Sequence, residues 1–358
     1  MSTFDELRIK SRIRDYSVLF TDNFRDPLIK DAGEKRCFFI IDSSIHHLYH
    51  EQLHDVLPPG RFFVVDAIEE HKSLDYVKTI IKSLLDSDIK RNDRLIALGG
   101  GIIQDIAGFV SSILFRGIEW FFYPTTLLAQ CDSCIGSKTS LNVDEFKNQL
   151  GTYYPPHHIV LDVNFLKTLS IADIRSGLGE IIKVHLLDGP DSLEYICSKY
   201  SQSDSAVLKE LIFRSLKIKK TIIEKDEFDK DYRNILNYGH TFGHAIESIT
   251  DYRVSHGQAV TAGMDIENYI SLRLQILPQV SFDLMRVPIM KNYPDFQLKE
   301  EHIEPLLVAL SKDKKNVDKN LTVILTKGAG EMLKMKLPLN DRLKEYIKEY
   351  INDYRKTI

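Results

Sequence analysis

Histidines and a glutamate are concentrated in one stretch in the second half of this chain. His240 and His244 are four residues apart, and Glu247 follows three residues later. The stretch is expected to form an α-helix, on which residues at these spacings share one face. His256 follows a short turn-like segment and opens the next expected helix. Neutral imidazoles and carboxylates are ligands that a divalent cation such as zinc prefers. Hydrogen-bonded core histidines are the alternative, but three histidines within seventeen positions favour a metal site.

A second segment supplies a carboxylate and an ammonium group at helical spacing. Glu180 and Lys183 are three residues apart, so they share one face of an expected helix. An ordinary surface ion pair is the alternative interpretation. The neighbours Ile181, Ile182 and Val184 are apolar, which indicates a protected interior instead. Glu180 is therefore the candidate for the third metal ligand.

Three consecutive glycines, Gly99 to Gly101, stand between an expected strand and an expected helix. Glycine lets the backbone approach a ligand closely, and the first N–H groups of a helix can bind a pyrophosphate. The segment therefore indicates a nucleotide site. It lacks the G-x-G-x-x-G pattern, so a purely structural tight turn is the alternative.

A polar loop follows the next expected strand and brings hydroxyl, carboxylate and ammonium groups close together in the sequence: Thr125, Thr126, Asp132, Lys138, Lys147 and Asn148. Lysine ammonium groups can hold phosphates or hydroxyls as point charges. A solvated loop is the alternative. Cys131 and Cys134 have C-x-x-C spacing, but without a second pair we expect two buried thiols rather than a redox or zinc pair.

The elements that must position these groups differ between the two halves of the chain. Short apolar runs alternate with helical patterns in the first half and predict strands at residues 37–42, 61–66, 94–98, 119–123 and 158–162. This alternation is typical of a parallel sheet covered by helices. From about residue 171, long helical patterns dominate, at residues 171–188, 202–225, 233–250, 257–276 and 341–357, with one expected strand at 321–326.

Composition narrows the class of protein. The chain has 358 residues, long enough for two domains, and 43% of them are hydrophobic. A net charge of -4 gives no basic excess for nucleic acid. Neither a secretory signal nor an apolar run of membrane-spanning length is visible. Four cysteines suit a reducing cytoplasm.

Taken together, these pieces resemble the sugar phosphate cyclase superfamily, and most closely the 3-dehydroquinate synthase family. The resemblance covers about residues 66–330 and rests on the motifs GGGIIQDIAGF, RGIEWFFYPTTLLAQCDS, SKTSLN, GLGEIIK, RNILNYGHTFGHAIE, HGQAVTAGM and DKKN. It implies an α/β, Rossmann-like N-terminal domain that binds NAD, expected at residues 1–165. It also implies a mainly α-helical C-terminal domain, expected at residues 166–358, that binds metal and substrate.

The resemblance also implies roles for individual residues. The ligands of Zn²⁺ or Co²⁺ would be Glu180, His240 and His256. NAD would be bound by Glu69, Lys72, Gly100, Gly101, Asp105, Thr125, Thr126, Lys138, Lys147 and Thr168. Substrate binding and catalysis would involve Asp132, Lys138, Asn148, Lys183, Lys219, Arg233, Asn237, His244 and Lys314, with Arg116 of the partner subunit reaching the substrate phosphate in a homodimer.

The implied reaction converts 3-deoxy-D-arabino-heptulosonate 7-phosphate to 3-dehydroquinate and phosphate, a step of aromatic amino acid biosynthesis on the shikimate pathway, in the cytoplasm. It proceeds by NAD-mediated transient oxidation, phosphate elimination, reduction and intramolecular aldol closure, so that NAD is recycled. Another sugar phosphate cyclase, such as one resembling 2-deoxy-scyllo-inosose synthase, is one alternative. A metal-dependent NAD alcohol dehydrogenase of the same fold is another, and it would accumulate NADH. A non-catalytic binding protein of the same fold is a third alternative. The chain keeps nearly all of the polar residues that the family uses at its site, which argues against this alternative.

Departures from the family pattern bear on the substrate. Residues 131–139 read CDSCIGSKT where the family usually has VDSSVGGKT, and residues 145–146 read EF where LG is usual. Gln104 replaces a glycine, and Asp229 stands where a glutamate is usual. Arg233 and Asn237 are kept, and a planar guanidinium is a natural partner for a substrate carboxylate. The retained pair favours the carboxylated seven-carbon substrate.

Overall fold

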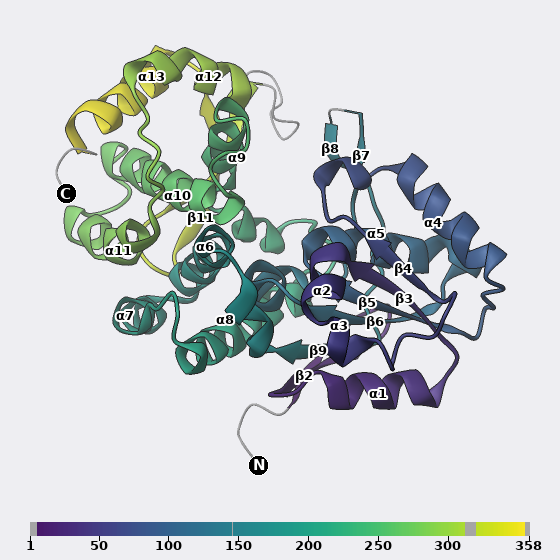
Figure 1. Cartoon of the computed structure of the whole chain (residues 1–358). Coiled ribbons are helices and arrows are strands. Elements are labelled where there is room, and N and C mark those ends of the chain that lie inside the picture. Colours follow the sequence, from purple (N-terminus) through teal and green to yellow (C-terminus); the bar gives the residue numbers. More distant parts are fainter. Residues whose placement is uncertain (1–5, 145, 312–319, 355–358) are drawn as a thin grey trace. The chain divides into compact units, whose positions relative to one another are not determined.

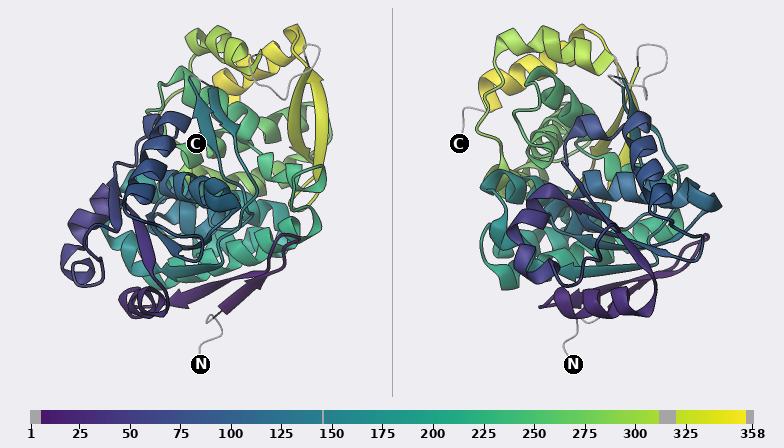
Figure 2. Two further views of the ribbon diagram at one scale, coloured as in Figure 1. Left: turned by 90° about the vertical axis from the view of Figure 1, so that its right-hand side faces the viewer. Right: turned by 45° about the vertical axis from the view of Figure 1, so that its right-hand side comes forward.

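The computed structural model describes residues 6–144, 146–311 and 320–354. Lys314, expected to contact substrate, and the rest of the DKKN motif lie outside the described residues. Figures 1 and 2 show the path of the chain. Among the described residues, no helix combines the length and apolar character needed to cross a membrane.

The chain divides into two compact units. The first unit consists of Met1–Leu169 and Lys220–Phe228, and the second of Ser170–Lys219 and Asp229–Ile358. The domain boundary expected at 165/166 therefore lies a few residues before the end of the first unit's main segment. The sequence had also assigned Lys220–Phe228 to the second domain, whereas its contacts place it in the first unit.

A sheet forms the centre of the first unit, with strand order β1-β2-β9-β6-β5-β3-β4 in the described residues. Only the pairing of β1 with β2 is antiparallel among the pairs of this sheet that the structure describes. The strands are β1 Glu6–Ile9, β2 Tyr16–Thr21, β3 Cys37–Asp42, β4 Phe62–Val65, β5 Arg94–Gly99, β6 Glu119–Pro124 and β9 His158–Asp162. The five strands expected in this half are confirmed to within one residue at each end. β1 and β2 were not expected.

Helices cover this sheet, as an α/β fold requires. α5 packs against β5, β6 and β3, and α2 packs against β3 and β4. The helical segments of the unit are α1 Arg25–Glu34, α2 Ser43–Leu48, α3 His50–Leu53, η1 Glu69–His71, α4 Leu74–Asp86, α5 Gly101–Ile113, η2 Leu114–Arg116, η3 Ala129–Ser133 and η4 Val163–Thr168. A separate antiparallel hairpin, β7 Leu141–Val143 with β8 Phe146–Leu150, stands beside them (Figure 1).

The local sequence explains the elements that matter most for the site. β5 is buried along its whole length, as strands covered on both faces are. α4 begins because the Ser73 side chain accepts a hydrogen bond from the Tyr76 backbone N–H, and it buries one apolar face through Val77, Ile80 and Leu84. α5 begins directly after the glycine turn, with Gly100 in extended conformation.

The second unit is mainly helical. Its elements are α6 Ile171–Asp188, α7 Pro190–Lys199, α8 Ser205–Lys225 as far as Lys219, η5 Tyr232–Asn237, α9 His240–Ile249, α10 His256–Arg273, α11 Gln279–Asn292, η6 Glu300–His302, α12 Ile303–Ser311, β10 Asn320–Thr326, β11 Met332–Pro338, α13 Asp341–Glu349 and η7 Tyr350–Tyr354. α10 is buried along most of its length and contacts α6, α9 and α11. β10 and β11 pair antiparallel, and Figure 2 shows them in yellow-green to yellow as a ribbon. The fold class expected from the sequence is confirmed.

One expected helix was wrong in its extent. Residues 233–250 do not form a single α-helix, because the 3-10 segment η5 ends at Asn237 and α9 begins at His240. Gly239 separates them with a φ of 77°, a left-handed conformation that glycine adopts at little cost. A Cβ on Gly239 would lie 2.6 Å from the Val260 carbonyl oxygen, so α10 also leaves no room for a side chain there. Arg233 and Asn237 therefore do not continue the face of α9.

Candidate active-site residues

The candidate metal ligands come from three helices of the second unit. Glu180 lies in the middle of α6, whereas His240 and His256 are the first residues of α9 and α10. Glu180 Oε1 lies 3.6 Å from His240 Nε2 and 3.5 Å from His256 Nε2. Donor atoms of all three residues lie within 4.8 Å of one another. The structure thus brings together the three side chains proposed from the sequence.

This arrangement fits a divalent cation. A tetrahedral zinc ion with bonds of about 2.0–2.1 Å holds its ligand atoms about 3.3–3.4 Å apart. The separations from Glu180 to the two imidazoles exceed this by only a few tenths of an ångström. Both Glu180 oxygens are buried, and the polar groups described beside them are the Lys183 ammonium and the two imidazoles. A carboxylate with two imidazoles is also a donor set that zinc uses at catalytic sites.

A close crossing of α6 and α10 sets this geometry. A Cβ added to Gly179 would lie 2.0 Å from the Gly257 carbonyl oxygen, and one added to Gly257 would lie 1.7 Å from the Ser176 carbonyl oxygen. These glycines directly precede Glu180 and directly follow His256. Backbone contact at the crossing therefore places the two ligands side by side.

Hydrogen bonds to Nδ1 orient both imidazoles. His240 Nδ1 lies 3.1 Å from the Tyr238 carbonyl oxygen, and His256 Nδ1 lies 3.3 Å from Glu247 Oε2. When Nδ1 carries the proton, Nε2 presents its lone pair. In both residues Nε2 is the atom that faces Glu180. The His244 ring lies 5.4 Å from that of His240 and 5.9 Å from that of His256, on the exposed side of α9.

A buried lysine contacts one of these ligands, and two further buried cations belong to the candidate set. The Lys183 ammonium contacts the Glu180 carboxylate, as expected from the sequence. Burial raises the pKa of Glu180, but Lys183 and His256 outweigh this effect and lower the pKa, so the carboxylate is ionised. Lys219 and Arg233 are each 5% exposed. The segment η5, which carries Arg233, packs against α6.

The loop before η5 is tied to it by an asparagine. Asn234 Nδ2 donates to Asp229 Oδ1 at 2.9 Å, and Lys334 Nζ donates to Asn234 Oδ1 at 2.6 Å. Asn237 Nδ2 donates to the Asn234 carbonyl oxygen at 3.0 Å. The conformation around Arg233 is thus fixed by side-chain bonds rather than by a continuous helix.

Within the first unit, several residues expected to contact NAD or substrate form one network. Lys72 Nζ lies 2.8 Å from Asp105 Oδ2 and donates to Asn148 Oδ1 at 2.8 Å. Glu69 Oε1 lies 3.8 Å from the same ammonium. Asn148, on β8, also accepts a hydrogen bond from Ser140. The hairpin is therefore joined to α5 through Lys72.

The glycine turn adjoins this network. Gly101 is the first residue of α5, and a Cβ on Gly100 would lie 2.9 Å from Thr126 Cγ2. Thr125 is buried, and its backbone N–H donates to the Gly99 carbonyl oxygen. The remaining candidates of the first unit lie on other elements. Lys138 is exposed, Lys147 is half-buried on β8, and Asp132 lies in η3. The Thr168 hydroxyl donates to the Phe165 carbonyl oxygen, and Arg116 is exposed in η2. Cys131 and Cys134 are buried thiols without a disulfide, as expected.

Sequence reasoning missed two residues of the network around Lys72 and one residue beside the candidate metal ligands. Ser140 donates to Asp105 Oδ2 at 2.8 Å, and Asn142 Nδ2 donates to Glu69 Oε1 at 2.8 Å. Both belong to the SKTSLN motif, so their position beside Lys138 was the available signal. Glu247 was noted on the face of His240 but given no role. The nine-residue gap from Glu247 to His256 contains a turn, so only the fold could reveal their contact.

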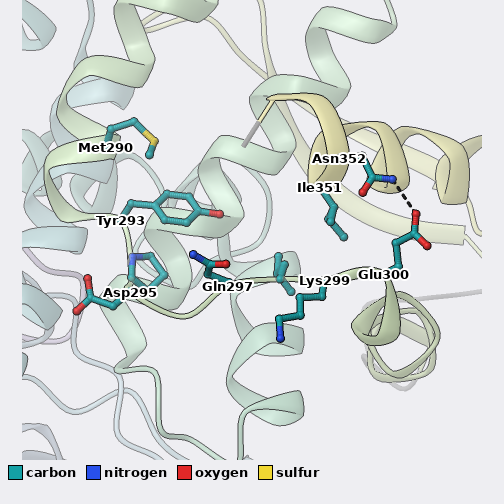
Figure 3. A pocket seen from close by; sticks show the side chains of 10 residues that line it. Met290, Tyr293, Asp295, Gln297, Lys299, Glu300, Ile351 and Asn352 are labelled. Atoms are coloured by element: carbon teal, nitrogen blue, oxygen red, sulfur yellow. Dashed lines mark hydrogen bonds between the residues drawn. The ribbon is translucent and has the colours of Figure 1, made fainter. Parts of the chain in front are cut away.

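A hollow of about 660 Å³ in the second unit lies apart from these residues (Figure 3). It is lined by residues that follow α11 and by the end of the chain, among them Tyr293, Asp295, Lys299, Glu300 and Asn352. Asn352 donates to Glu300 across it. Its charged groups are of both signs and exposed.

The sequence matches the two domains of one family. Residues 62–176 match the domain described as 3-dehydroquinate synthase N-terminal, and residues 177–316 match the one described as 3-dehydroquinate synthase C-terminal. Over 313 residues the chain is 36% identical to the 3-dehydroquinate synthase of Alkaliphilus metalliredigens, covering 86% of this chain and 88% of that protein.

Solved structures share the fold. A 2-deoxy-scyllo-inosose synthase complexed with carbaglucose-6-phosphate, NAD⁺ and Co²⁺ superimposes with a TM-score of 0.86 at 24% identity, over 97% of this chain and 99% of that one. The 2-epi-5-epi-valiolone synthase of Streptomyces hygroscopicus subsp. jinggangensis 5008, with NAD⁺ and Zn²⁺ bound, has a TM-score of 0.78 at 24% identity, over 94% and 96%.

Proposed function

The chain belongs to the 3-dehydroquinate synthase family and is an enzyme of the phosphorus–oxygen lyase class, and we propose that it converts 3-deoxy-D-arabino-heptulosonate 7-phosphate to 3-dehydroquinate and phosphate. The observation that carries this proposal is the convergence of Glu180, His240 and His256 in a second unit whose sequence matches that family. The retained Arg233 and Asn237 support the carboxylated substrate.

Glu180, His240 and His256 would hold a divalent ion, with zinc as the first choice. When bound, such an ion polarises a substrate hydroxyl as a Lewis acid. The protein itself holds the three donor side chains in position without the ion. The α6–α10 crossing fixes Glu180 against His256, and the Tyr238 carbonyl holds the His240 ring.

The first unit would hold NAD, which would supply reversible hydride transfer to and from the substrate. Backbone N–H groups at Gly100 and Gly101 open α5 and can bind the pyrophosphate. Asp105 and Lys72 are held in place by their mutual contact and can meet the ribose hydroxyls. Glu69, Thr125, Thr126, Lys138, Lys147 and Thr168 complete the proposed set.

Cationic side chains of the second unit would bind the substrate's two anions. Arg233 and Lys219 are almost completely buried, and a charge-assisted hydrogen bond from such a cation to an anion is stronger than one between neutral groups. We assign the substrate carboxylate to Arg233, with Asn237, and the phosphate to the lysines Lys183 and Lys219 with His244. Asp132, Asn148 and Lys314 would contact the hydroxyl groups. Each of these groups favours the anionic forms that develop during elimination and ring closure.

We also propose a cytoplasmic homodimer in which Arg116 of the partner subunit reaches the phosphate. Arg116 is exposed, with a φ of 64°, on a 3-10 turn that projects from the end of α5. Mixing an Arg116→Ala variant with a His256→Ala variant tests this, since a hybrid dimer would regain one complete site. No recovery of activity in a mixture shown to exchange subunits would contradict an Arg116 acting across the dimer.

The substrate is tested by a phosphate-release assay over seven-carbon and six-carbon sugar phosphates, with mass analysis of the products. We expect the carboxylated seven-carbon substrate to be preferred and Arg233→Ala to lower its kcat/KM by about thirty- to a thousand-fold, the loss of about 2–4 kcal/mol of charge-assisted bonding. Glucose 6-phosphate should be a poor substrate for both proteins. A wild type that prefers glucose 6-phosphate would assign the chain to another cyclase of the superfamily.

A further inference from the structure

Glu247 lies directly behind one of the proposed metal ligands. It is on α9, two turns after His240, and its Oε2 is 3.3 Å from His256 Nδ1. The opposite edge of the same ring faces Glu180, at 3.5 Å from Nε2. The His256 ring is thus held between two carboxylates from different helices, Glu180 on α6 and Glu247 on α9.

The two carboxylates face chemically different atoms of the ring. A neutral imidazole has one N–H and one lone pair, and a metal takes the lone pair. A carboxylate at Nδ1 accepts the N–H and so selects the form with the lone pair on Nε2. It also fixes the rotation of the ring about its bond to Cβ. Glu247 therefore selects the same atom, Nε2, that the fold directs toward Glu180 and His240.

His240 obtains the same orientation by other means, because a backbone carbonyl, that of Tyr238, accepts from its Nδ1. His256 is the first residue of its helix and follows a turn, so its neighbouring backbone offers no such contact in the described structure. Its side chain is also the more exposed of the two, at 31% against 14%. The Nδ1 acceptor that orients His256 is thus a side chain, Glu247, whereas the one that orients His240 is a backbone carbonyl.

Charge supports the same conclusion. Lys183 places a positive charge against Glu180, at the position where a cation would bind. Glu247, half-buried with its side chain 13% exposed, places a compensating negative charge on the far side of His256. A buried carboxylate that strengthens the basicity of a ligand imidazole increases its affinity for a cation.

We propose that Glu247 is a positioning residue that holds His256 in the Nδ1–H form and thereby tightens binding of the divalent ion. This inference rests on the proposed metal site of Glu180, His240 and His256. Loss of such an outer carboxylate costs about 10- to 100-fold in metal affinity in comparable sites. Glu247→Ala should therefore raise the zinc dissociation constant by about that factor while leaving one ion per chain.

The test is competition of the full-length, metal-stripped protein with a chromophoric chelator for Zn²⁺, for wild type, Glu247→Ala, Glu247→Gln and His256→Ala. Glu345→Ala is the matched control, because Glu345 is an exposed glutamate on α13 of the same unit. Glu247→Gln keeps an acceptor oxygen but loses the charge, so its affinity should lie between those of wild type and Glu247→Ala. Glu345→Ala should bind as wild type does.

A second measurement separates orientation from a general loss of structure. Nitrogen-15 NMR of histidine-labelled protein reports which ring nitrogen carries the proton. In the metal-free wild type and in metal-free Glu247→Gln, His256 should give a protonated Nδ1 that is hydrogen-bonded. In metal-free Glu247→Ala the Nδ1–H form should lose its dominance. An unchanged His256 spectrum in Glu247→Ala would overturn the positioning role.

The outcomes distinguish this inference from the site itself. A wild type that binds no stoichiometric zinc, or a His256→Ala variant that binds it normally, would overturn the proposed metal site. A wild type that binds zinc with an affinity matched by Glu247→Ala would overturn only the inference about Glu247. His244, Glu247 and His256 form a second possible donor group. If Glu247→Gln abolished stoichiometric binding while Glu180→Gln kept it, Glu247 would be a ligand and not a positioning residue.

Discussion

The ammonium of Lys183 contacts the carboxylate of Glu180 one turn earlier on α6, and the two side chains are 3% and 1% exposed. Removing one partner of a buried ion pair leaves the other charge uncompensated, at a cost of about 3–5 kcal/mol. A bound cation would take over the compensation of Glu180. We therefore predict that Lys183 pairs with Glu180 when no ion is bound and becomes available to the substrate when one is.

Lys183→Met should separate stability, metal binding and turnover. The metal-free variant should lose about 3 kcal/mol of stability in urea unfolding, and saturating Zn²⁺ should restore most of it. Zinc affinity should rise, because a like charge next to the ion is gone, whereas turnover should fall at least a hundred-fold. A variant with weaker zinc binding and unchanged stability would show that Lys183 does not compensate Glu180.

The α6–α10 crossing should tolerate no added methyl group. Gly179→Ala would bring a Cβ within 2.0 Å of the Gly257 carbonyl oxygen, so the helices must separate at a cost of about 1–3 kcal/mol. The midpoint temperature of thermal unfolding and the affinity for zinc should both fall, because Glu180 moves with α6. Gly33→Ala is the control: its Cβ would meet nothing within 4 Å on the exposed side of α1. Equal behaviour of the two variants would contradict the role given to the crossing.

Lys72→Met should weaken NAD binding. The ammonium holds Asp105 and Asn148 together, at 2.8 Å from each. Burial raises the pKa of Asp105, and Lys72 opposes this effect, so loss of Lys72 leaves a carboxylate less suited to orient ribose hydroxyls. We expect a 10- to 100-fold larger dissociation constant for NAD by calorimetry, the value of a charged hydrogen bond. Lys78→Met, an exposed lysine on α4, should bind NAD normally.

Acid should destabilise the second unit through His185. This residue is fully buried on α6, and its Nδ1 lies 2.7 Å from the Ile181 carbonyl oxygen. Burial lowers the pKa of His185 to about 4 from the usual histidine value of 6.5. Between these values the unfolded chain binds a proton that the folded chain refuses, so stability is greatest above pH 6.5 and is lost as the pH falls toward 4.

The measurement is urea unfolding of the metal-free protein at pH 7.5 and pH 5. His185→Gln should reduce the difference in unfolding free energy between the two pH values by about 2 kcal/mol. His47→Gln, an exposed histidine on α2, should leave that difference as it is in wild type. If His185→Gln showed the same pH dependence of unfolding free energy as wild type, the loss of stability in acid would come from groups other than His185.

The sequence predicted the parts of this protein whose signals are local. Buried strands such as β5 are continuous apolar runs, and the helical pattern at residues 171–188 coincides with the observed bounds of α6. Contacts between distant segments were not predictable in this way. The break at Gly239 depends on the space that α10 leaves, and the Glu247–His256 contact depends on the turn between two helices. The hydrogen bonds of Ser140 and Asn142 exist because the β7–β8 hairpin lies beside α5 and η1.

The most direct test of a cyclase with recycled NAD is turnover of 3-deoxy-D-arabino-heptulosonate 7-phosphate by the zinc-loaded protein at NAD concentrations below that of the substrate. Phosphate, NADH and the carbocyclic product are measured together, with His256→Ala as the control. The account predicts many phosphates and many carbocycles per NAD, no accumulation of NADH, and loss of both phosphate and carbocycle formation in His256→Ala. One NADH accumulated for each substrate consumed, without phosphate release, would contradict it and identify a dehydrogenase.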